Sequence, residues 1–288
     1  DIFQKEITNP DVIVQMSPVL DGVADHMAEY GEREAFRVAT ETPCNVEDVL
    51  KQSGAEILVC YLPVGSERAV KLFAEACLSS NVAMINCVPV FIASNPDWAE
   101  KFKRAGLPII GDDIKSQVGA TIVHRTLADL FSKRGCKLKR TYQLNTAGNT
   151  DFLNMIALDR LKSKKSSKTN SVQSQLPTPL ASENIHIGPS DYIPWQKDNK
   201  VAFIRLEGEG FGGAPIEMEI RLSVQDSPNS AGVVIDAIRC AKLALSRKLT
   251  GALAAPSAYY MKSPPAQLTD HQAFDSLKAF IAGDGSLT

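Results

Sequence analysis

Residues 107–121 read LPIIGDDIKSQVGAT, and this stretch decides the fold. Residues 107–110 form an apolar segment typical of a buried strand, and a polar turn of glycine, two carboxylates, lysine and serine follows. A helical pattern then begins, whose apolar face is made by Val118, Ile122, Val123, Leu127 and Phe131. Free backbone N–H groups point out of a helix N-terminus. A strand, a turn and a helix in this order are therefore typical of an anion site in an α/β sheet.

The residues before this stretch alternate between strand and helix patterns. Residues 56–61 and 82–88 are short apolar runs typical of buried strands. Ser66 starts a helical pattern between them, and Asn-Pro at 95–96 predicts the start of another helix. This alternation predicts parallel βαβ units and a doubly wound parallel sheet. Such sheets bind ligands beyond the carboxyl ends of their strands. Those ends are expected to hold residues 62–65, Asn86 and residues 111–113.

The pattern changes after Phe131. Residues 137–145 are typical of a strand and residues 152–161 of a helix. Residues 162–183 are rich in Ser, Lys, Thr and Gln, and from composition alone a flexible solvated linker is the favoured interpretation.

The last third of the chain begins with a strictly alternating segment. Residues 216–224 place Ile, Met, Ile, Leu and Val on one face and polar side chains on the other. This indicates a strand of an antiparallel sheet, one face of which is exposed to solvent or covered by a partner. Ser230 is then expected to cap an apolar helix over 232–245, and residues 254–281 are expected to be helical with loops.

Composition places the chain among ordinary globular proteins. Its 288 residues are 44% hydrophobic and 22% charged. A net charge of −2 gives no electrostatic basis for binding nucleic acid or an anionic membrane, and no apolar run approaches the length of a membrane span. The six cysteines lie far apart without a CxxC pair, which favours a reducing, cytoplasmic location and argues against a structural zinc site.

Ten ordered blocks resemble the inositol-phosphate synthase family, in its shorter bacterial type. They run from near Val12 to near Pro265. The blocks are VQMSPVLDGVADHM (14–27), YLPVGSE (61–67), NCVPVFIAS (86–94), GDDIKSQVGAT (111–121), LNTAGNTDFLNM (144–155), SKKSSKT (163–169), HIGPSDY (186–192), VAFIRLEG (201–208), QDSPNSAGVVIDAI (225–238) and SAYYMKSPP (257–265).

The resemblance implies a Rossmann-like α/β domain interrupted by an α+β insertion that carries catalysis and tetramer contacts. We expect an NAD-binding part over 1–116, the insertion over 117–229 and a return to the first domain over 230–288. Family members begin with a glycine-rich turn of the GxGNCA kind, whereas this sequence has no GxGxxG before Ser66. A first βα unit and its return strand need roughly 30 residues. We therefore expect a piece of a longer protein that binds NAD weakly by itself.

The resemblance also implies an activity and its partners. The family converts D-glucose 6-phosphate to 1D-myo-inositol 3-phosphate, the first step toward inositol and phosphatidylinositol. NAD⁺ oxidises the C5 hydroxyl, the C6 enolate attacks the C1 aldehyde, and NADH reduces the ring ketone. The implied cofactors are NAD and an activating cation that no residue is assigned to hold. The implied assembly is a homotetramer, with a sugar phosphate as substrate and neither nucleic acid nor membrane as partner.

Four lysines match the family's active-site positions. Lys164 and Lys168 are four residues apart and would share a face if their segment is helical. The resemblance gives Lys164 proton transfer and Lys168 the substrate phosphate. It places Lys200 as a third active-site lysine, both catalytic and near the phosphate, and Lys262 near the aldehyde end of the sugar. Lysines packed together suit this chemistry because repulsion and burial lower their pKa values.

Carboxylates and polar turns complete the expected site. Asp113 matches a catalytic carboxylate near the nicotinamide that orients a lysine. Asp112 is a cofactor candidate or a structural turn acceptor, and Asp226 lies beside the nicotinamide or caps the turn 227–230. Further phosphate candidates are Ser116, Gln117, Asn145 and Asn149. Further cofactor candidates are Leu62, Pro63, Gly65, Asn86 and Ser227. His124 and His186 lack a nearby carboxylate or serine partner, so a structural role is expected for both.

Three functions remain open at this point. The first is an inositol-3-phosphate synthase, an NAD-dependent isomerase. The second is an NAD-linked sugar-phosphate dehydrogenase, which would not need four lysines. The third is a non-catalytic fragment that retains the oligomerisation core, and the missing glycine-rich turn is the feature that favours it.

Overall fold

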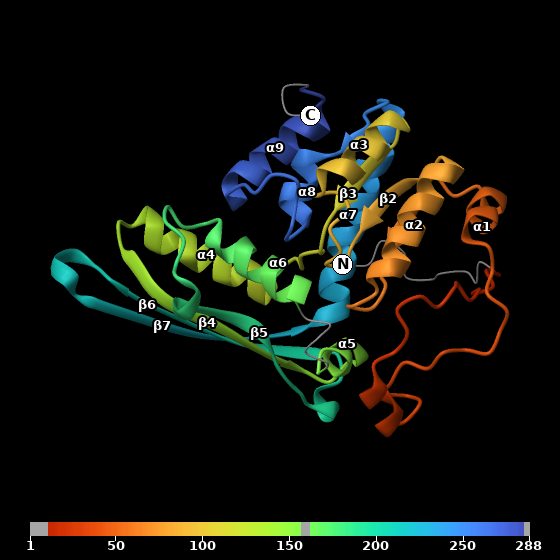
Figure 1. The fold of residues 1–288 in the computed structure, drawn as a ribbon. Helices are drawn as coiled ribbons and strands as arrows, with labels where there is room; N and C mark the ends of the chain where they lie inside the picture. The colour runs from red at the N-terminus through yellow and green to blue at the C-terminus, as the bar shows by residue number, and fades with distance from the viewer. Residues whose placement is uncertain (1–10, 157–161, 285–288) are drawn as a thin grey trace.

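The strands of the chain form two separate sheets. The computed structural model describes residues 11–156 and 162–284, apart from the side chains of residues 162–166. Within these residues each sheet has four strands, in the orders β1-β2-β3-β8 and β5-β4-β6-β7. Figure 1 shows the first sheet among the helices of the upper half and the second as a long layer below it.

The first sheet is the predicted parallel one. It comprises β1 (Ile57–Cys60), β2 (Ala83–Asn86), β3 (Pro108–Gly111) and β8 (Gly251–Ala252), and every neighbouring pair is parallel. Its helices are α1 (Val46–Ser53), α2 (Glu67–Ser80), α3 (Pro96–Arg104), α7 (Asp226–Ser246), α8 (Ala254–Tyr260) and α9 (Asp270–Ala282). The predicted α/β fold is therefore confirmed.

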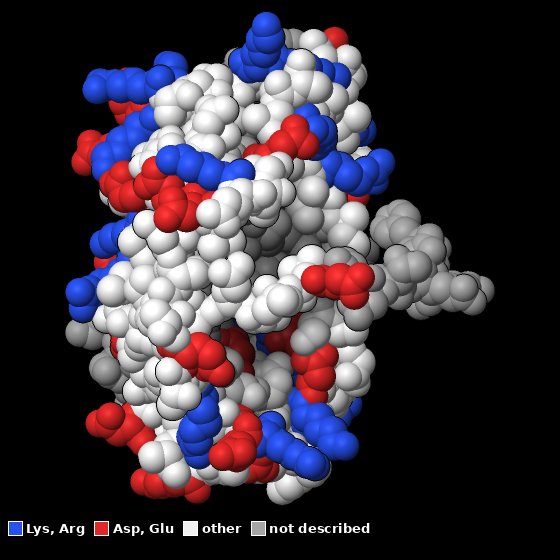
Figure 2. Space-filling model, turned by 90° about the vertical axis from the view of Figure 1, so that its right-hand side faces the viewer, with Lys and Arg blue, Asp and Glu red and all other residues white. Residues whose placement is uncertain are grey.

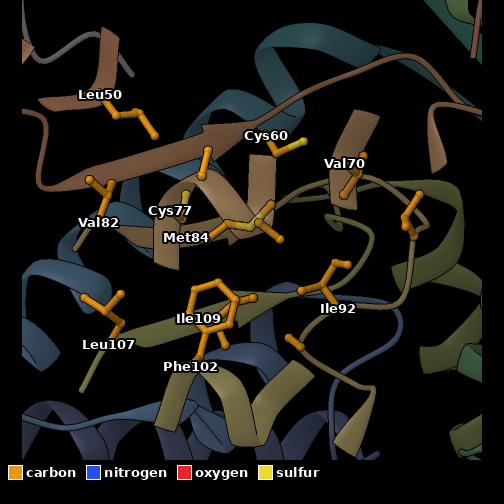
Figure 3. Packing of buried hydrophobic residues seen from close by; sticks show 14 of the residues in the cluster. Leu50, Cys60, Val70, Cys77, Val82, Met84, Ile92, Phe102, Leu107 and Ile109 are labelled. Carbon is orange, nitrogen blue, oxygen red and sulfur yellow. The ribbon is translucent and has the colours of Figure 1, made fainter. Parts of the chain in front are cut away.

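Apolar clusters cover both faces of this sheet. On one face Met84 and Ile109 pack against α2 and against Phe102 of α3, as Figure 3 shows. On the other face Ile85 and Ile110 pack against the apolar side of α7. Mostly apolar strands covered on both faces are typical of a parallel sheet, because its crossover helices lie over both of its faces.

The second sheet is mixed and lies beside two helices. It comprises β4 (Lys137–Ala147), β5 (Ile185–Tyr192), β6 (Asn199–Glu209) and β7 (Pro215–Gln225). β4 pairs in parallel with β5, whereas β4–β6 and β6–β7 are antiparallel. The helices α4 (Ala120–Lys133) and α6 (Lys162–Gln173) cover one face of it, as Figure 1 shows. β7 alternates between half-buried and exposed residues, as its sequence predicts.

Three predicted boundaries need correction. The helix after the GDDIKS turn begins at Ala120, and Val118 lies before it with 57% of its surface exposed. The helix predicted over 232–245 begins at Asp226, because the Asp198 carboxylate accepts the Ser227 backbone N–H at 3.0 Å and satisfies its first turn. The helix predicted over 152–161 is α5, Thr150–Asn154, while 157–161 lie outside the described residues.

The linker interpretation of residues 162–183 is also wrong. Residues 162–173 form α6, in which Ser167, Lys168, Ser171 and Val172 are buried. Composition missed this helix because its buried face is mostly polar and is paired by tertiary contacts rather than by an apolar stripe. Among the described residues, no helix is long and apolar enough to cross a membrane.

Candidate active site

A cavity of about 390 Å³ lies where the carboxyl ends of β1, β2 and β3 face the second sheet. Its lining is Tyr61–Val64, Cys87–Pro89, Asp113, Ile114, Ser116, Gly119–Ile122, Gln143, Asn149, Asp151, Phe152, Met155, Lys168, Lys200, Asp226, Ser227, Ser230, Lys262 and Phe36. Figure 2 shows the face on the right of Figure 1, where basic and acidic side chains are interspersed around a hollow. The ends of parallel strands are where such sheets bind ligands.

Asp113 is the centre of the most ordered group in this cavity. Its carboxylate is 3% exposed and accepts from Lys262 Nζ at 2.7 Å through Oδ1 and from Ser167 Oγ at 2.7 Å through Oδ2. Ser167 in turn accepts from the Ser263 hydroxyl at 2.8 Å. The group therefore joins β3, α6 and the segment after α8, and it brings the predicted pair Asp113 and Lys262 together.

A second ion pair lines the other side of the cavity. Lys200 Nζ lies 3.1 Å from Asp226 Oδ1 and 5.7 Å from the centre of the Phe152 ring. Lys200 comes from the start of β6, and Asp226 from the first residue of α7. The turn interpretation of Asp226 is thereby replaced by an ion pair at a helix N-terminus, where an acidic side chain is favourable.

Asp198, which the sequence did not single out, organises this side. It accepts from the Ser227 hydroxyl at 2.7 Å and from the Asn149 side-chain amide at 3.3 Å. Asn149 also caps α5 by accepting the Phe152 N–H at 3.1 Å. Both predicted ligands, Asn149 and Ser227, line the cavity, but each is held by these internal hydrogen bonds.

The helix α6 contributes the lysines of SKKSSK. Lys168 is 4% exposed and lines the cavity. Lys164 lies one turn earlier on the same helix, and its side chain is outside the described part of the chain. Because this segment is helical, the four-residue spacing places Lys164 and Lys168 on one side of the helix backbone.

Asp112 and Asn86 are among the predicted cofactor ligands that do not line the cavity. Asp112 is fully buried and accepts from the Asn86 amide at 2.7 Å, from three backbone N–H groups of residues 92–94, and from the Ser94 hydroxyl. Burial raises the pKa of Asp112 to about 6, against the opposing effect of these hydrogen bonds. The structure therefore favours the alternative of a turn acceptor for Asp112, with Asn86 as its partner.

The remaining predicted ligands divide between the cavity and its supports. Leu62, Pro63 and Ser116 line the cavity, whereas Gly65 does not. Gln117 is directed toward α7, where a Cβ added at Gly232 would lie 2.7 Å from its Cδ. Asn145 is buried and donates to the Gly188 carbonyl at 2.7 Å, so its amide is already engaged. Ser116 and Gln117 precede the first residue of α4 rather than opening that helix.

Gln143, which the sequence did not single out, connects the cavity lining to buried polar residues behind it. Gln143 lines the cavity and donates to Asn145 at 3.0 Å. His124 contacts Gln143 at 3.3 Å and Thr141 at 2.7 Å, and burial lowers its pKa to about 4. A neutral, buried His124 fits the structural role expected for it, whereas His186 is exposed on β5.

The cavity lining holds three lysines and three aspartates, and further buried cations lie behind it. Lys115, Arg125 and Lys168 are all at least 96% buried, and the Lys262 side chain is 13% exposed. Burial, followed by the repulsion of Arg125 and Lys262, lowers the pKa of Lys115 to about 7, although Asp270 opposes this shift. Within the cavity itself, Lys168, Lys200 and Lys262 are the cationic groups that an anionic ligand would contact.

The chain is similar in sequence to a family model and to several curated proteins. The family model described as myo-inositol-1-phosphate synthase matches residues 119–227. The inositol-3-phosphate synthase of Mycolicibacterium smegmatis is 52% identical over 282 residues, which cover 96% of this chain and 76% of that protein. The inositol-3-phosphate synthase of Mycobacterium tuberculosis is 50% identical, over 96% of this chain and 74% of that protein.

A solved structure agrees in fold. The myo-inositol-1-phosphate synthase-related protein of Thermotoga maritima is 26% identical with a TM-score of 0.72. The match covers 83% of this chain and 69% of that one. The chain spans about three quarters of the length of the two mycobacterial relatives.

Proposed function

The chain belongs to the myo-inositol-1-phosphate synthase family, and from this premise we propose that it is an inositol-3-phosphate synthase. The proposed reaction is an isomerisation of D-glucose 6-phosphate to 1D-myo-inositol 3-phosphate with no net redox change. The observation that carries the proposal is that Lys168, Lys200 and Lys262 come from three separate segments and line one cavity. A plain sugar-phosphate dehydrogenase would not need three lysines there.

The cavity also fits a nicotinamide cofactor. It opens at the carboxyl ends of a parallel sheet, and Leu62, Pro63 and Val64 give it an apolar wall after β1. We propose that these residues, together with Asp113, Asp226 and Ser227, hold NAD. NAD bound there would accept a hydride from the sugar and return it after ring closure.

The substrate phosphate is assigned to the α4 and α6 side of the cavity. Lys168 supplies a buried ammonium, and Ser116 lies beside the start of α4, whose residues Gly119–Ile122 also line the cavity. A cation and free backbone N–H groups together are a favourable environment for phosphate. Lys200, across the cavity in its pair with Asp226, is a second cation for this group.

The proton transfers are assigned to the other lysines. Lys164 is assigned as the group that accepts the proton from the sugar hydroxyl that is oxidised, since a lysine amine can act as a general base. Lys262 donates to the aldehyde oxygen during ring closure, and Asp113 holds its ammonium at 2.7 Å in the required direction. Asp113 thus orients Lys262 and keeps its charge in the cavity.

We propose the domain division 1–116, 117–229 and 230–288, with NAD on the first and last parts. The two sheets support it, since β1–β3 and β8 fall outside 117–229 and β4–β7 within it. We also propose a cytoplasmic homotetramer that uses the exposed face of β6 and β7, where Phe203 is 44% exposed beside the Arg205–Glu219 ion pair. An activating cation belongs to the same proposal, without an assigned site.

The experiment is an assay of the full gene product, including any residues encoded ahead of Asp1. Incubation with glucose 6-phosphate and NAD⁺ in catalytic amount should yield inositol phosphate, detected by ³¹P NMR, in many-fold excess over the cofactor. NADH that accumulates in proportion to product would contradict the proposal and favour a dehydrogenase. Lys262→Ala should abolish the product, and the exposed-site control Lys278→Ala should retain it.

A further inference from the structure

Lys115 is a fully buried lysine that does not line the cavity. It is 2% exposed, and its Nζ donates to the Ala258 carbonyl at 2.7 Å and the Tyr259 carbonyl at 3.1 Å. These carbonyls belong to the last turn of α8, where backbone acceptors have no partner within the helix. A cation at this end of a helix is also favoured by the helix dipole.

The backbone around Lys115 is paired with the segment that carries Lys262. The Lys115 N–H donates to the Tyr260 carbonyl at 2.8 Å, and the Lys262 N–H donates to the Asp113 carbonyl at 2.7 Å. Asp112 and Ser263 exchange two further backbone hydrogen bonds, of 3.0 and 2.9 Å. Residues 112–115 and 260–263 therefore run antiparallel, with Asp113 and Lys262 in the middle of the pair.

We infer that Lys115 is a positioning residue that fixes the segment after α8, so that the Lys262 ammonium stays against the Asp113 carboxylate. Lys115 closes one end of the antiparallel pair through three hydrogen bonds to three consecutive carbonyls, Ala258, Tyr259 and Tyr260. Lys262 follows these residues directly. The catalytic role of Lys262 in this inference rests on the proposed function.

Packing alone does not account for a lysine at this position. Arg125 from α4 and Lys262 face it with like charge, and Asp270 from the start of α9 is the acidic group that opposes them. A buried ammonium in such surroundings is costly, and a methionine of similar length would fill the space without that cost. What methionine cannot supply is the donor to the two α8 carbonyls, which would then be buried without a partner.

The test compares Lys115→Met with the exposed control Lys278→Met in the full gene product. Hydrogen exchange is measured by mass spectrometry on peptides that cover 260–264 and, as a reference, 83–88. We expect exchange in Lys115→Met to rise about tenfold in the first peptide and to stay unchanged in the second, because the local hydrogen bonds open more often. We also expect kcat to fall about tenfold with KM for glucose 6-phosphate within about twofold, because the phosphate lysines are untouched.

Each outcome decides the inference. Unchanged exchange at 260–264 overturns it, even if kcat falls, because Lys115 would then act by another route. Raised exchange with an unchanged kcat overturns the link to Lys262. If the wild-type enzyme does not convert glucose 6-phosphate, the proposed function fails, and the exchange comparison alone still decides whether Lys115 holds the segment. Should Lys115→Met not fold, Lys115→Gln, which has no charge and a side chain one atom shorter, replaces it and is judged by the same two measurements.

Discussion

The lysines of the cavity are expected to differ in whether they bind or react. Lys168 would hold the phosphate, which is present in the substrate and in the transition state alike. We therefore predict that Lys168→Ala raises KM about tenfold to a hundredfold and changes kcat little, since a charge-assisted hydrogen bond is lost equally in both states.

Lys164→Arg should lower kcat about a hundredfold, because a guanidinium does not accept a proton near neutral pH.

Steady-state kinetics on the full gene product test both variants. Lys168→Arg is the matched control and should recover part of the affinity, because a guanidinium binds phosphate well. A Lys168→Ala enzyme in which only kcat changes would reverse the assignment. A Lys164→Arg enzyme with wild-type kcat would remove Lys164 from the proton transfer and leave the family membership untouched.

The burial of Lys115 predicts a pH dependence of stability. Burial lowers its pKa from 10.5 to about 7 in the folded protein. Between these values the unfolded chain binds more protons than the folded one, so the contribution of Lys115 to stability rises with pH across this window. Urea unfolding is measured from pH 7 to about 10. The free energy of unfolding of the wild type minus that of Lys115→Met should increase by up to about 1.4 kcal/mol per pH unit. A constant difference would mean that Lys115 titrates normally.

The residue type alone could not distinguish side chains that line the cavity from side chains that only hold the backbone around it. The predicted position of residues 111–113 at the carboxyl end of β3 is confirmed, yet Asp112 and Asp113 are adjacent and their contacts in the structure differ. Asp112 accepts N–H groups of residues 92–94, whereas Asp113 meets Lys262 and Ser167. Lys115 lies in the same motif, and its sequence context does not distinguish it from a surface lysine. Its partners lie 143 residues or more away, so no local pattern could reveal its burial.

At the scale of elements, the first turn of α7 depends on a residue outside the helix. The Asp198 carboxylate accepts the Ser227 N–H and hydroxyl, and Ser227 and Asp226 line the cavity. We predict that Asp198→Ala costs about 1 kcal/mol of stability, as loss of a helix cap does. It should also raise KM several-fold, because the first turn of α7 would no longer be held.

A matched control separates these two effects. Asn95 caps α3 by accepting the N–H groups of Asp97 and Trp98 at 2.9 and 3.2 Å, and α3 does not line the cavity. Asn95→Ala should cost about 1 kcal/mol as well and leave KM unchanged. Urea unfolding and initial rates give both quantities. Equal KM values for the two variants would show that the cap of α7 does not shape the site.

Elements with strong periodicity were predicted well, and elements stabilised by distant groups were not. The strands β1, β2 and β3 follow directly from short apolar runs between turn residues, and the alternation of 216–224 identified β7. The start of α7 was missed because its cap, Asp198, precedes the helix by 28 residues and belongs to the other sheet's loop. α6 was missed because its buried residues are Ser and Lys, whose partners appear only in the folded chain.

At the scale of the whole molecule, the cavity exists only while the two sheets hold their relative position. Lys168 belongs to α6, which packs with the second sheet, and Lys262 follows α8 on the first. A small rotation between these parts would separate Lys168 from the Asp113–Lys262 pair. A misplacement of about 1 Å can cost two orders of magnitude in rate. The contacts that join the two parts therefore bear on catalysis.

Arg125 is the most deeply buried of these contacts. It lies on α4 with no exposed surface, and it donates to Asp270 at 3.0 Å, to the Leu268 carbonyl at 2.9 Å and to the Ser171 carbonyl of α6 at 2.6 Å. It thus ties α4 and α6 to the start of α9. Such a residue stabilises one arrangement of the two sheets rather than either sheet alone.

We predict that Arg125→Met destabilises the protein by about 3 kcal/mol, because it leaves buried acceptors and the Asp270 carboxylate without their cation. Arg104→Met, at a side chain that is 79% exposed, should change stability by less than about 0.5 kcal/mol. KM for glucose 6-phosphate should rise in Arg125→Met alone, since α6 and Lys168 lose their tie to the first sheet. Urea unfolding with initial-rate kinetics measures both effects. A large stability loss with unchanged KM would show that other contacts set the position of α6.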